Sequence, residues 1–240
     1  MSNKTAIITG ASRGIGRAIA LTLAENGYNL ELICHKNIDM LRALSDELTS
    51  KYNIVCHTHC GDVGDYDFVS KLYESINDVD VLVNNAGISY FGLISDMTPD
   101  EWHNIMHTNL DSVFYMSKFA TNLMLKKHDG NIINISSVWG NVGASLESAY
   151  SASKGAVNTF TKALAKELAP SNISVNAIAC GIVDTEMNSH LTSEEIEEII
   201  NEIPSNRLGT PDEIGQMVMS VINAPSYMTG QIITVDGGWT

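Results

Sequence analysis

The sequence predicts a doubly wound α/β fold, a parallel sheet of about seven strands with helices on both faces. Strand-like apolar runs alternate with amphipathic segments along the chain, and each such helix returns the chain across a sheet face, which makes the strands parallel. Runs such as VDVLV and NIINI are almost entirely apolar, as in strands buried on both faces. No Pro- or Ser-rich linker divides the 240 residues, so we expect one domain over residues 1–240.

Strands are predicted from short apolar runs that lie between turn-forming residues. In chain order they are Ala6–Thr9, Leu30–Cys34, Ile54–Thr58, Val79–Val83, Asn131–Ser136, Ser174–Ala177 and Gln231–Val235. Helices are predicted from apolar residues three to four positions apart, such as Ile15, Ile19 and Leu23. In chain order they are Ile15–Glu25, Ile38–Thr49, Asp65–Ile76, Asp100–Lys126, Ser148–Leu168, Ser193–Ile203 and Asp212–Ile222. In such folds the ligand site lies beyond the carboxyl ends of the strands.

Composition and charge exclude several classes of protein. Hydrophobic residues make up 44% and charged residues 18% of the chain, which excludes a disordered or low-complexity protein. Lys and Arg number 14 against 28 Asp and Glu, and the net charge of -14 argues against nucleic acid or an anionic membrane as a partner. From Gly181 onward Arg207 is the sole basic residue among many acids. We expect an active-site loop and an acidic, solvated helical segment at about 181–205.

The chain has no apolar run of 18 residues, and its first apolar stretch is too short for a signal peptide, so we expect a cytoplasmic protein. The cysteines are then expected to be free thiols: Cys34, Cys56, Cys60 and Cys180. The run Cys56–Cys60 (CHTHC) has the side chains of a metal site. Alternate residues of a strand point to opposite faces, however, so its two Cys and two His cannot converge, and we expect no metal.

A glycine-rich turn follows the first predicted strand. The motif comprises Gly10, Ser12, Arg13, Gly14, Ile15 and Gly16. Glycines let a backbone turn tightly and approach a phosphate, whose charge is stabilised by the free N–H groups of the helix that begins there. The spacing Gly-x3-Gly-x-Gly differs from the G-x-G-x-x-G fingerprint, and glycine is common in strand-to-helix turns, so this motif favours nucleotide binding without establishing it.

Tyr150 and Lys154 lie four residues apart at the start of a predicted helix. This spacing places both side chains on one helix face, where the ammonium group lowers the pKa of the phenol toward neutral pH and makes it a usable acid or base. Taken by itself, the pair is weak evidence, because Tyr and Lys four residues apart more often belong to an exposed amphipathic face.

The order of these motifs carries more information than any one of them. The glycine turn, the run Asn84–Gly87, Asn109, Ser137 and the Tyr150/Lys154 pair follow one another across about 150 residues. In this respect the chain resembles the short-chain dehydrogenase/reductase family from Lys4 to Trp239, which implies a Rossmann-like fold. The Asn-Ser-Tyr-Lys catalytic set of that family matches Asn109, Ser137, Tyr150 and Lys154, with Ser137 thirteen positions before Tyr150.

The resemblance implies a role for each member of this set. Tyr150 would give a proton to a carbonyl oxygen in reduction and take it back in oxidation. Lys154 would lower the pKa of Tyr150 and hold the ribose hydroxyls of a nicotinamide cofactor, which supplies the hydride. Ser137 would hydrogen-bond the substrate oxygen, and Asn109 would hold a water that links Lys154 to solvent.

The resemblance also implies which cofactor binds. Members that use NAD carry an acidic residue at the end of the second strand, where this chain has Cys34 followed by His35 and Lys36. NADPH/NADP is therefore expected rather than NADH, with Arg13, Lys36 and His35 near the 2′-phosphate. The other positions that the resemblance assigns to the cofactor are Asp62, Val63, Asn85, Ala86, Gly87, Tyr150, Lys154, Gly181, Val183 and Thr185. In the family a proline usually precedes the glycine that is Gly181 here. This chain has Cys180 instead, so the φ angle at position 180 is not fixed by a proline ring.

The subgroup most similar in pattern is the 3-oxoacyl-[acyl-carrier-protein] reductases of fatty acid synthesis. This similarity implies a carrier-bound carbonyl substrate, with an acidic carrier protein near Lys126 and Lys127, although Ser171 stands where the subgroup has Arg. A net charge of -14 disfavours an acidic partner. A reductase of another small ketone, alcohol, sugar or acetoacetyl-CoA therefore remains open, as does a non-catalytic, nucleotide-sensing member of the family.

The predicted helix Ser148–Leu168 has small and apolar residues on more than one side, including Ala152, Ala163 and Phe160. This is more apolar surface than one sheet contact covers. A partner subunit is the simplest cover, and the resemblance implies a homotetramer built on this helix and on Asp100–Lys126, with the strand Gln231–Val235 in a second interface.

Overall fold

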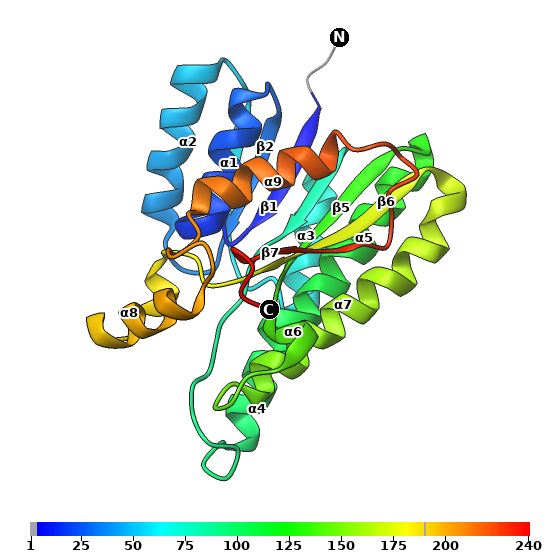
Figure 1. Cartoon of the computed structure of the whole chain (residues 1–240). Helices are drawn as coiled ribbons and strands as arrows, with labels where there is room; N and C mark the ends of the chain where they lie inside the picture. The colour runs from blue at the N-terminus through cyan, green and yellow to red at the C-terminus, as the bar shows by residue number, and fades with distance from the viewer. Residues whose placement is uncertain (1–3, 190) are drawn as a thin grey trace.

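The computed structural model describes residues 4–189 and 191–240. These residues form one sheet of seven strands (Figure 1). The strands are β1 (Thr5–Thr9), β2 (Asn29–Cys34), β3 (Cys56–Cys60), β4 (Val81–Asn84), β5 (Gly130–Ser137), β6 (Ile173–Cys180) and β7 (Ile232–Val235). Their spatial order is β3-β2-β1-β4-β5-β6-β7, and every neighbouring pair is parallel. The predicted doubly wound fold is confirmed.

Helices cover both faces of this sheet (Figure 1). They are α1 (Gly14–Glu25), α2 (Ile38–Tyr52), α3 (Tyr66–Ser75), α4 (Pro99–Met106), α5 (Ser112–Lys127), α6 (Trp139–Val142), α7 (Ser148–Leu168), α8 (Ser193–Glu202) and α9 (Pro211–Ile222). One core cluster joins the sheet to α1, α2 and α9, and the other joins it to α3, α5 and α7. Short helices α4, α6 and α8 gather instead around one end of the sheet.

Alternation along the strands produces these two clusters. In β1, Ala6 and Ile8 face the first cluster and Ile7 faces the second, and all three are fully buried. Side chains of a strand alternate between faces, so a strand buried on both sides is apolar throughout. The continuous apolar runs in the sequence are therefore a direct consequence of the two-sided core.

The direction of strand addition reverses beside β1. The first three strands extend the sheet one way, and β4 then pairs with the free side of β1. Chain connections on the two sides of this point lead away from each other, which opens a crevice at the carboxyl ends of β1 and β4. We therefore expect a ligand site next to the glycine turn.

Two predicted elements differ from the structure. Strand β3 spans Cys56–Cys60 rather than Ile54–Thr58, because its residues pair with β2 as far as Cys34. The predicted helix Asp100–Lys126 is divided into α4 and α5 by a π-helical turn at His107–Asp111. Such turns insert one residue into a helix and are frequent at functional sites.

The structure also bears on the predicted absence of a metal and of a membrane span. His57 Nδ1 and His59 Nε2 both hydrogen-bond the carboxylate of Glu31, at 2.8 and 2.6 Å. Over residues 4–189 and 191–240 we find no cluster of three or more side chains arranged to hold a metal ion. No helix in these same ranges has the length and apolarity needed to cross a membrane.

Candidate active site

The carboxyl end of β1 leads into the predicted glycine turn. Gly10 and Gly14 have positive φ angles of 66° and 54°, which favour glycine. Gly16 has a second reason to be glycine, because a Cβ there would lie 2.2 Å from the backbone oxygen of Gly10. Among the residues that the structure describes, no side chain caps the first turn of α1, whose N-cap residue is Arg13. The backbone N–H groups at this helix end therefore face the crevice without a side-chain acceptor.

Hydrogen bonds fix the glycine turn against the loop that follows β4. Thr9 Oγ1 accepts from the backbone N–H groups of Asn85 and Ala86, both at 3.0 Å. Asn85 Nδ2 donates in return to the backbone oxygens of Thr9 and Gly10, at 3.0 and 3.1 Å. This reciprocal arrangement explains why an Asn follows β4, and it brings predicted residues 75 positions apart into one wall of the crevice.

Other predicted cofactor residues lie at the ends of β2 and β3. His35 and Lys36 are exposed directly after β2, and Val63 is buried after β3. Asp62 accepts from the Gly64 N–H at 2.8 Å and contacts His107 Nε2 at 3.1 Å. Burial raises the pKa of Asp62, but these two hydrogen bonds and the nearby histidines outweigh it, so the pKa lies below its usual value. Asp62 is therefore a charged acceptor in the crevice.

Ser137, Tyr150 and Lys154 come together beyond β5. Ser137 ends the strand, its Oγ accepts from the backbone N–H of Trp139 at 3.2 Å, and its side chain is near enough to that of Tyr150 to lower the pKa of the phenol. Lys154 Nζ donates to the Ile135 oxygen at 2.9 Å and lies 5.7 Å from the centroid of the Tyr150 ring. The helical spacing of Tyr150 and Lys154 thus does what the sequence predicted: it places both on one side of α7.

The pKa of Tyr150 is shifted in a different direction from the one that we expected. Burial is the main cause of a raised pKa at Tyr150, with the charge of Glu147 adding to it and the hydrogen bond to Ser137 opposing it. Burial also lowers the pKa of Lys154 to about 8. We expected Lys154 to lower the pKa of Tyr150. In the structure desolvation dominates both groups, so Tyr150 is shifted in the opposite direction.

Asn109 is fully buried in the π-helical turn. Its Oδ1 accepts from the Ile88 N–H at 2.8 Å, and its Nδ2 donates to the Ile88 oxygen at 2.9 Å and to Ser153 Oγ at 3.0 Å. A Cβ on Gly87 would lie 3.4 Å from both Asn109 Oδ1 and Lys154 Nζ. Asn109 therefore links Ile88, in the loop after β4, to Ser153 of α7, which precedes Lys154 in the chain.

The loop after β6 closes the crevice from the other side. Gly181 packs against β7, where a Cβ would lie 2.8 Å from Asp236 Cα, and Val183 is buried. Thr185 lies over the glycine turn, with its Cγ2 3.4 Å from the position of a Cβ on Gly14. Thr185 of this loop is thereby brought to the amino end of α1.

Cys180 lies closer to the reactive side chains than the sequence indicated. It is buried, and burial raises the pKa of its thiol to about 12 while the charge of Lys154 opposes that rise. From the sequence it had no visible basic neighbour. The fold supplies Lys154, yet the net effect is a protonated, unreactive thiol, as expected for a buried cysteine.

Sequence reasoning missed three residues that shape this region. Glu186 contacts the guanidinium of Arg13. Trp139 and Trp239 pack edge to face, with ring centroids 4.9 Å apart, and Trp239 Nε1 donates to Glu202 Oε2 at 3.3 Å. The chain end is thereby attached to both α6 and α8. A Trp two residues after Ser137 and another near the chain end were the available signals, but nothing in the sequence pairs them.

The predicted carrier-docking residues lie at the other end of β5. Lys126 is exposed, but Lys127 Nζ is bound by Asp78 and Asp80, both at 2.7 Å. Ser137 stands at the far end of this eight-residue strand, about 25 Å away at the usual rise per residue. The basic patch expected here is therefore largely neutralised and distant from the Ser137 of its own chain.

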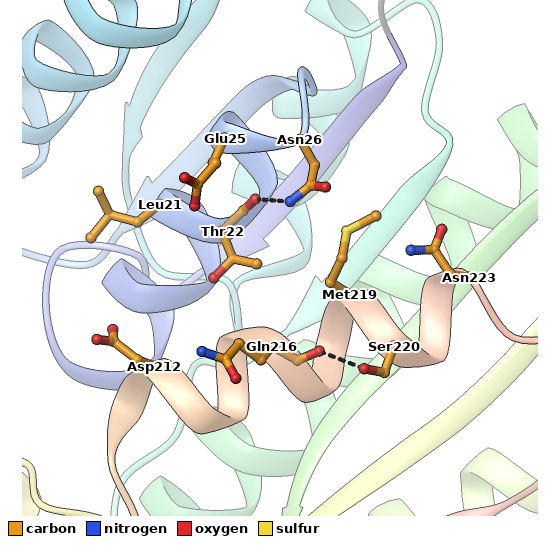
Figure 2. Close-up of a pocket in the computed structure, with 9 residues that line it drawn as sticks. All are labelled: Leu21, Thr22, Glu25, Asn26, Asp212, Gln216, Met219, Ser220 and Asn223. Carbon is orange, nitrogen blue, oxygen red and sulfur yellow. Dashed lines mark hydrogen bonds between the residues drawn. The ribbon is translucent and has the colours of Figure 1, made fainter.

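A surface pocket of about 470 Å³ lies between α1 and α9 and is lined by none of the predicted site residues. Figure 2 shows the residues that line it. Thr22, Glu25 and Asn26 line it from the carboxyl half of α1, and Gln216 and Ser220 from α9. The two helices cross closely because Gly215 lacks a Cβ, which would lie 2.6 Å from Thr22 Oγ1. This pocket is therefore separate from the site formed by Ser137, Tyr150 and Lys154.

Comparisons with known proteins agree with this geometry. Residues 4–196 match the family model described as short chain dehydrogenase. The chain is 42% identical to the uncharacterized oxidoreductase YmfI of Bacillus subtilis, covering 99% of each protein. It is 38% identical to the 3-oxoacyl-[acyl-carrier-protein] reductase FabG of Chlamydia muridarum, covering 98% of this chain and 97% of that protein.

Solved structures are similar over the same extent. The structure of YwfH, an NADPH-dependent reductase involved in bacilysin biosynthesis, is 26% identical in sequence, with a TM-score of 0.94 over 100% of this chain and 99% of that one. The chain therefore belongs to the short-chain dehydrogenase/reductase family of oxidoreductases that act on carbonyl and alcohol groups.

Proposed function

We propose that the protein is an NADPH-dependent reductase that transfers hydride to the carbonyl group of an acyl thioester or another small ketone. The observation that carries this proposal is the meeting of Ser137, Tyr150 and Lys154 beside a glycine turn. Tyr150 and Lys154 come from one face of α7, and the fold brings Ser137, at the end of β5, to them. An oxygen between Ser137 and Tyr150 would have two hydroxyl donors.

The crevice suits a dinucleotide. The uncapped amino end of α1 offers N–H groups to a pyrophosphate, and Gly10, Gly14 and Gly16 leave the space that side chains would fill. Asp62 is an acceptor for the amino group of an adenine, and Lys154 a donor to ribose hydroxyls. When bound, the nicotinamide supplies the hydride.

The residues of this chain then manage the substrate and the proton. Ser137 Oγ–H and the Tyr150 phenol hold the substrate oxygen by hydrogen bonds, which strengthen as negative charge develops on it. Tyr150 gives its proton to that oxygen. Lys154, positively charged below its pKa of about 8, stabilises the phenolate that remains. Asn109 holds the neighbouring backbone in place.

Cofactor preference rests on Arg13 and Lys36, together with the lack of an acid at the end of β2. A 2′-phosphate beside these two cations forms charge-assisted hydrogen bonds worth about 1–3 kcal/mol. Arg13→Ala should therefore remove most of the preference for NADPH over NADH, measured as two dissociation constants by fluorescence titration. Equal dissociation constants in the wild-type protein would contradict the assignment.

The 3-oxoacyl thioesters are the first candidate substrates because of the similarity to 3-oxoacyl-[acyl-carrier-protein] reductases. A small ketone not attached to a carrier is the second candidate. The pairing of Lys127 with Asp78 and Asp80 favours it, since little positive charge remains to attract an acidic carrier. Acetoacetyl-CoA serves as a probe for both, because it contains the 3-oxo thioester without the carrier.

The test is consumption of NADPH in the presence of acetoacetyl-CoA, of the carrier-bound ester and of a panel of small ketones. Faster turnover of the carrier-bound ester supports the first candidate, and faster turnover of a free ketone supports the second. Binding of NADPH without turnover of any substrate would favour a nucleotide-sensing protein. Failure to bind NADPH or NADH would contradict the proposed function altogether.

A further inference from the structure

Arg13, to which the proposed function assigns the 2′-phosphate of NADPH, is in contact with Glu186. Arg13 is the N-cap residue of α1, and its guanidinium contacts the Glu186 carboxylate. Glu186 follows Thr185, which lies against Gly14 of the glycine turn. The loop after β6 therefore holds a carboxylate where the proposed function requires a phosphate to approach.

This ion pair contributes little to the folded state. The two side chains are 55% and 63% exposed, and exposed pairs stabilise proteins only weakly. Water and salt screen the attraction, so the pair opens easily. Its main effect is therefore on other anions that approach Arg13.

The charge of Glu186 acts against a phosphate in two ways. It occupies donors of Arg13 that a phosphate would use, since guanidinium binds carboxylate and phosphate with the same planar geometry. It also places a negative charge within a few ångströms of the bound phosphate, where Coulomb repulsion is appreciable even in water. A cofactor that lacks the 2′-phosphate experiences neither effect at Arg13.

We propose that Glu186 is a specificity-determining residue that competes with the 2′-phosphate of NADPH for Arg13 and so reduces the preference for NADPH over NADH. This inference rests on the proposed function, because it assumes that Arg13 meets that phosphate. Arg13 has two alternative partners, the carboxylate of the loop after β6 and the phosphate of the cofactor.

The experiment measures dissociation constants of NADPH and NADH for the wild-type protein and for Glu186→Gln. The amide keeps the size of the side chain and removes its charge. NADPH should bind about threefold to tenfold more tightly to the variant, while binding of NADH changes less than twofold. The gain for NADPH should shrink at high salt, because the repulsion that was removed is screened there.

Two further variants serve as controls. Glu194→Gln removes the same charge from the first turn of α8, away from Arg13, and should change neither constant more than twofold. Adding Glu186→Gln to Arg13→Ala should give a smaller gain for NADPH than Glu186→Gln gives alone, because the contested guanidinium is absent and only the direct repulsion of the phosphate is relieved.

The outcomes separate the two proposals. If the wild-type protein binds NADPH but Glu186→Gln behaves like Glu194→Gln, or binds NADPH more weakly, the competition is refuted and the proposed function stands. Weaker binding would mean that Glu186 orients Arg13 toward the phosphate. If the wild-type protein binds neither nucleotide, the proposed function is refuted, and the competition with it.

Discussion

At the scale of single residues, burial prepares Tyr150 and Lys154 for different tasks. Burial raises the pKa of Tyr150, so the phenol remains protonated at neutral pH, as a proton donor must. Burial lowers the pKa of Lys154 to about 8, so this side chain changes its charge close to neutral pH. The phenol therefore retains its proton until Lys154 and the developing charge on the substrate help to remove it.

Replacing Tyr150 with Phe tests the proton donor. The variant keeps the ring and loses the hydroxyl, so kcat should fall about 10²-fold or more, the range for a general acid. The dissociation constant of the cofactor should stay within a few-fold. Stopped-flow turnover and fluorescence titration measure the two quantities. Retention of more than about a tenth of the wild-type kcat would mean that another group supplies the proton.

The pKa of Lys154 predicts how the rate of reduction depends on pH. If the charged amine stabilises the phenolate, kcat/KM for reduction falls as the pH rises through about 8, where Lys154 loses its proton. An Arg at this position stays charged throughout that range, so Lys154→Arg should lack this alkaline decrease in whatever activity it keeps. A wild-type profile that is flat to pH 10 would contradict the role given to Lys154.

The residues of the candidate site show what could and could not be predicted from the sequence. Asn109, Ser137, Tyr150 and Lys154 could be proposed as a group because their spacing along the chain is distinctive, and their roles stay predictions. Contacts between distant residues were not predictable: Glu186 lies 173 positions from Arg13, and the fold of the loop after β6 brings the two together. The direction of the Tyr150 pKa shift was also unpredictable, because it depends on burial.

At the scale of elements, apolar runs predicted the strands and their order along the chain. The boundaries of β3 were wrong because Cys56–Cys60 is polar, and pairing with β2 decides where this edge strand lies. The π-helical turn at His107–Asp111 had no signal, since no Pro or Gly interrupts the helical pattern there. Its structural partner is the backbone of Ile88, far away in the sequence.

The hydrogen bonds of Glu31 in β2 with His57 and His59 in the edge strand β3 should stabilise the folded protein. Burial raises the pKa of Glu31, but its hydrogen bonds to the two histidines outweigh burial and lower it. Glu31→Gln should reduce the free energy of unfolding at pH 7 by about 1.5–3 kcal/mol, the range for hydrogen bonds to charged groups. Chemical denaturation measures the difference, with the exposed Glu74→Gln as the control expected to change little.

The pH dependence follows from the direction of the same shift. A carboxylate whose pKa is lower in the folded state stabilises the protein fully above its unfolded pKa, and this stabilisation is lost as the pH falls through the folded value. The difference between wild type and Glu31→Gln should therefore diminish in acid. A difference that persists well below the pKa of the folded carboxyl would attribute it to packing instead.

At the scale of the whole molecule, α7 is the element that connects chemistry with assembly. Its inner face carries Tyr150 and Lys154, and its outer face exposes Ala152 and Ala163, with Phe160 partly exposed. Exposed small and apolar residues on a long helix favour close contact with another helix. We expect a partner subunit on this outer face, within the homotetramer that the family resemblance implies.

Placing a charge on that face tests the expectation. Phe160→Asp should reduce the molecular mass measured by light scattering at micromolar concentration, because an aspartate buried in an interface is costly. Activity should fall with the mass, since α7 also carries the reactive side chains. The exposed Lys162→Asp on the same helix controls for the effect of an added negative charge. A wild-type protein that is monomeric and fully active would refute both parts.

The measurement that tests the central claim most directly follows the hydride itself. The protein is incubated with acetoacetyl-CoA and NADPH that carries deuterium at the transferable C4 position, and the product is analysed by mass spectrometry. The account predicts a 3-hydroxy thioester with one deuterium on the new carbinol carbon, formed by the wild-type protein and nearly absent with Tyr150→Phe. Oxidation of the nucleotide without deuterium in the product, or equal labelling by the variant, would contradict it.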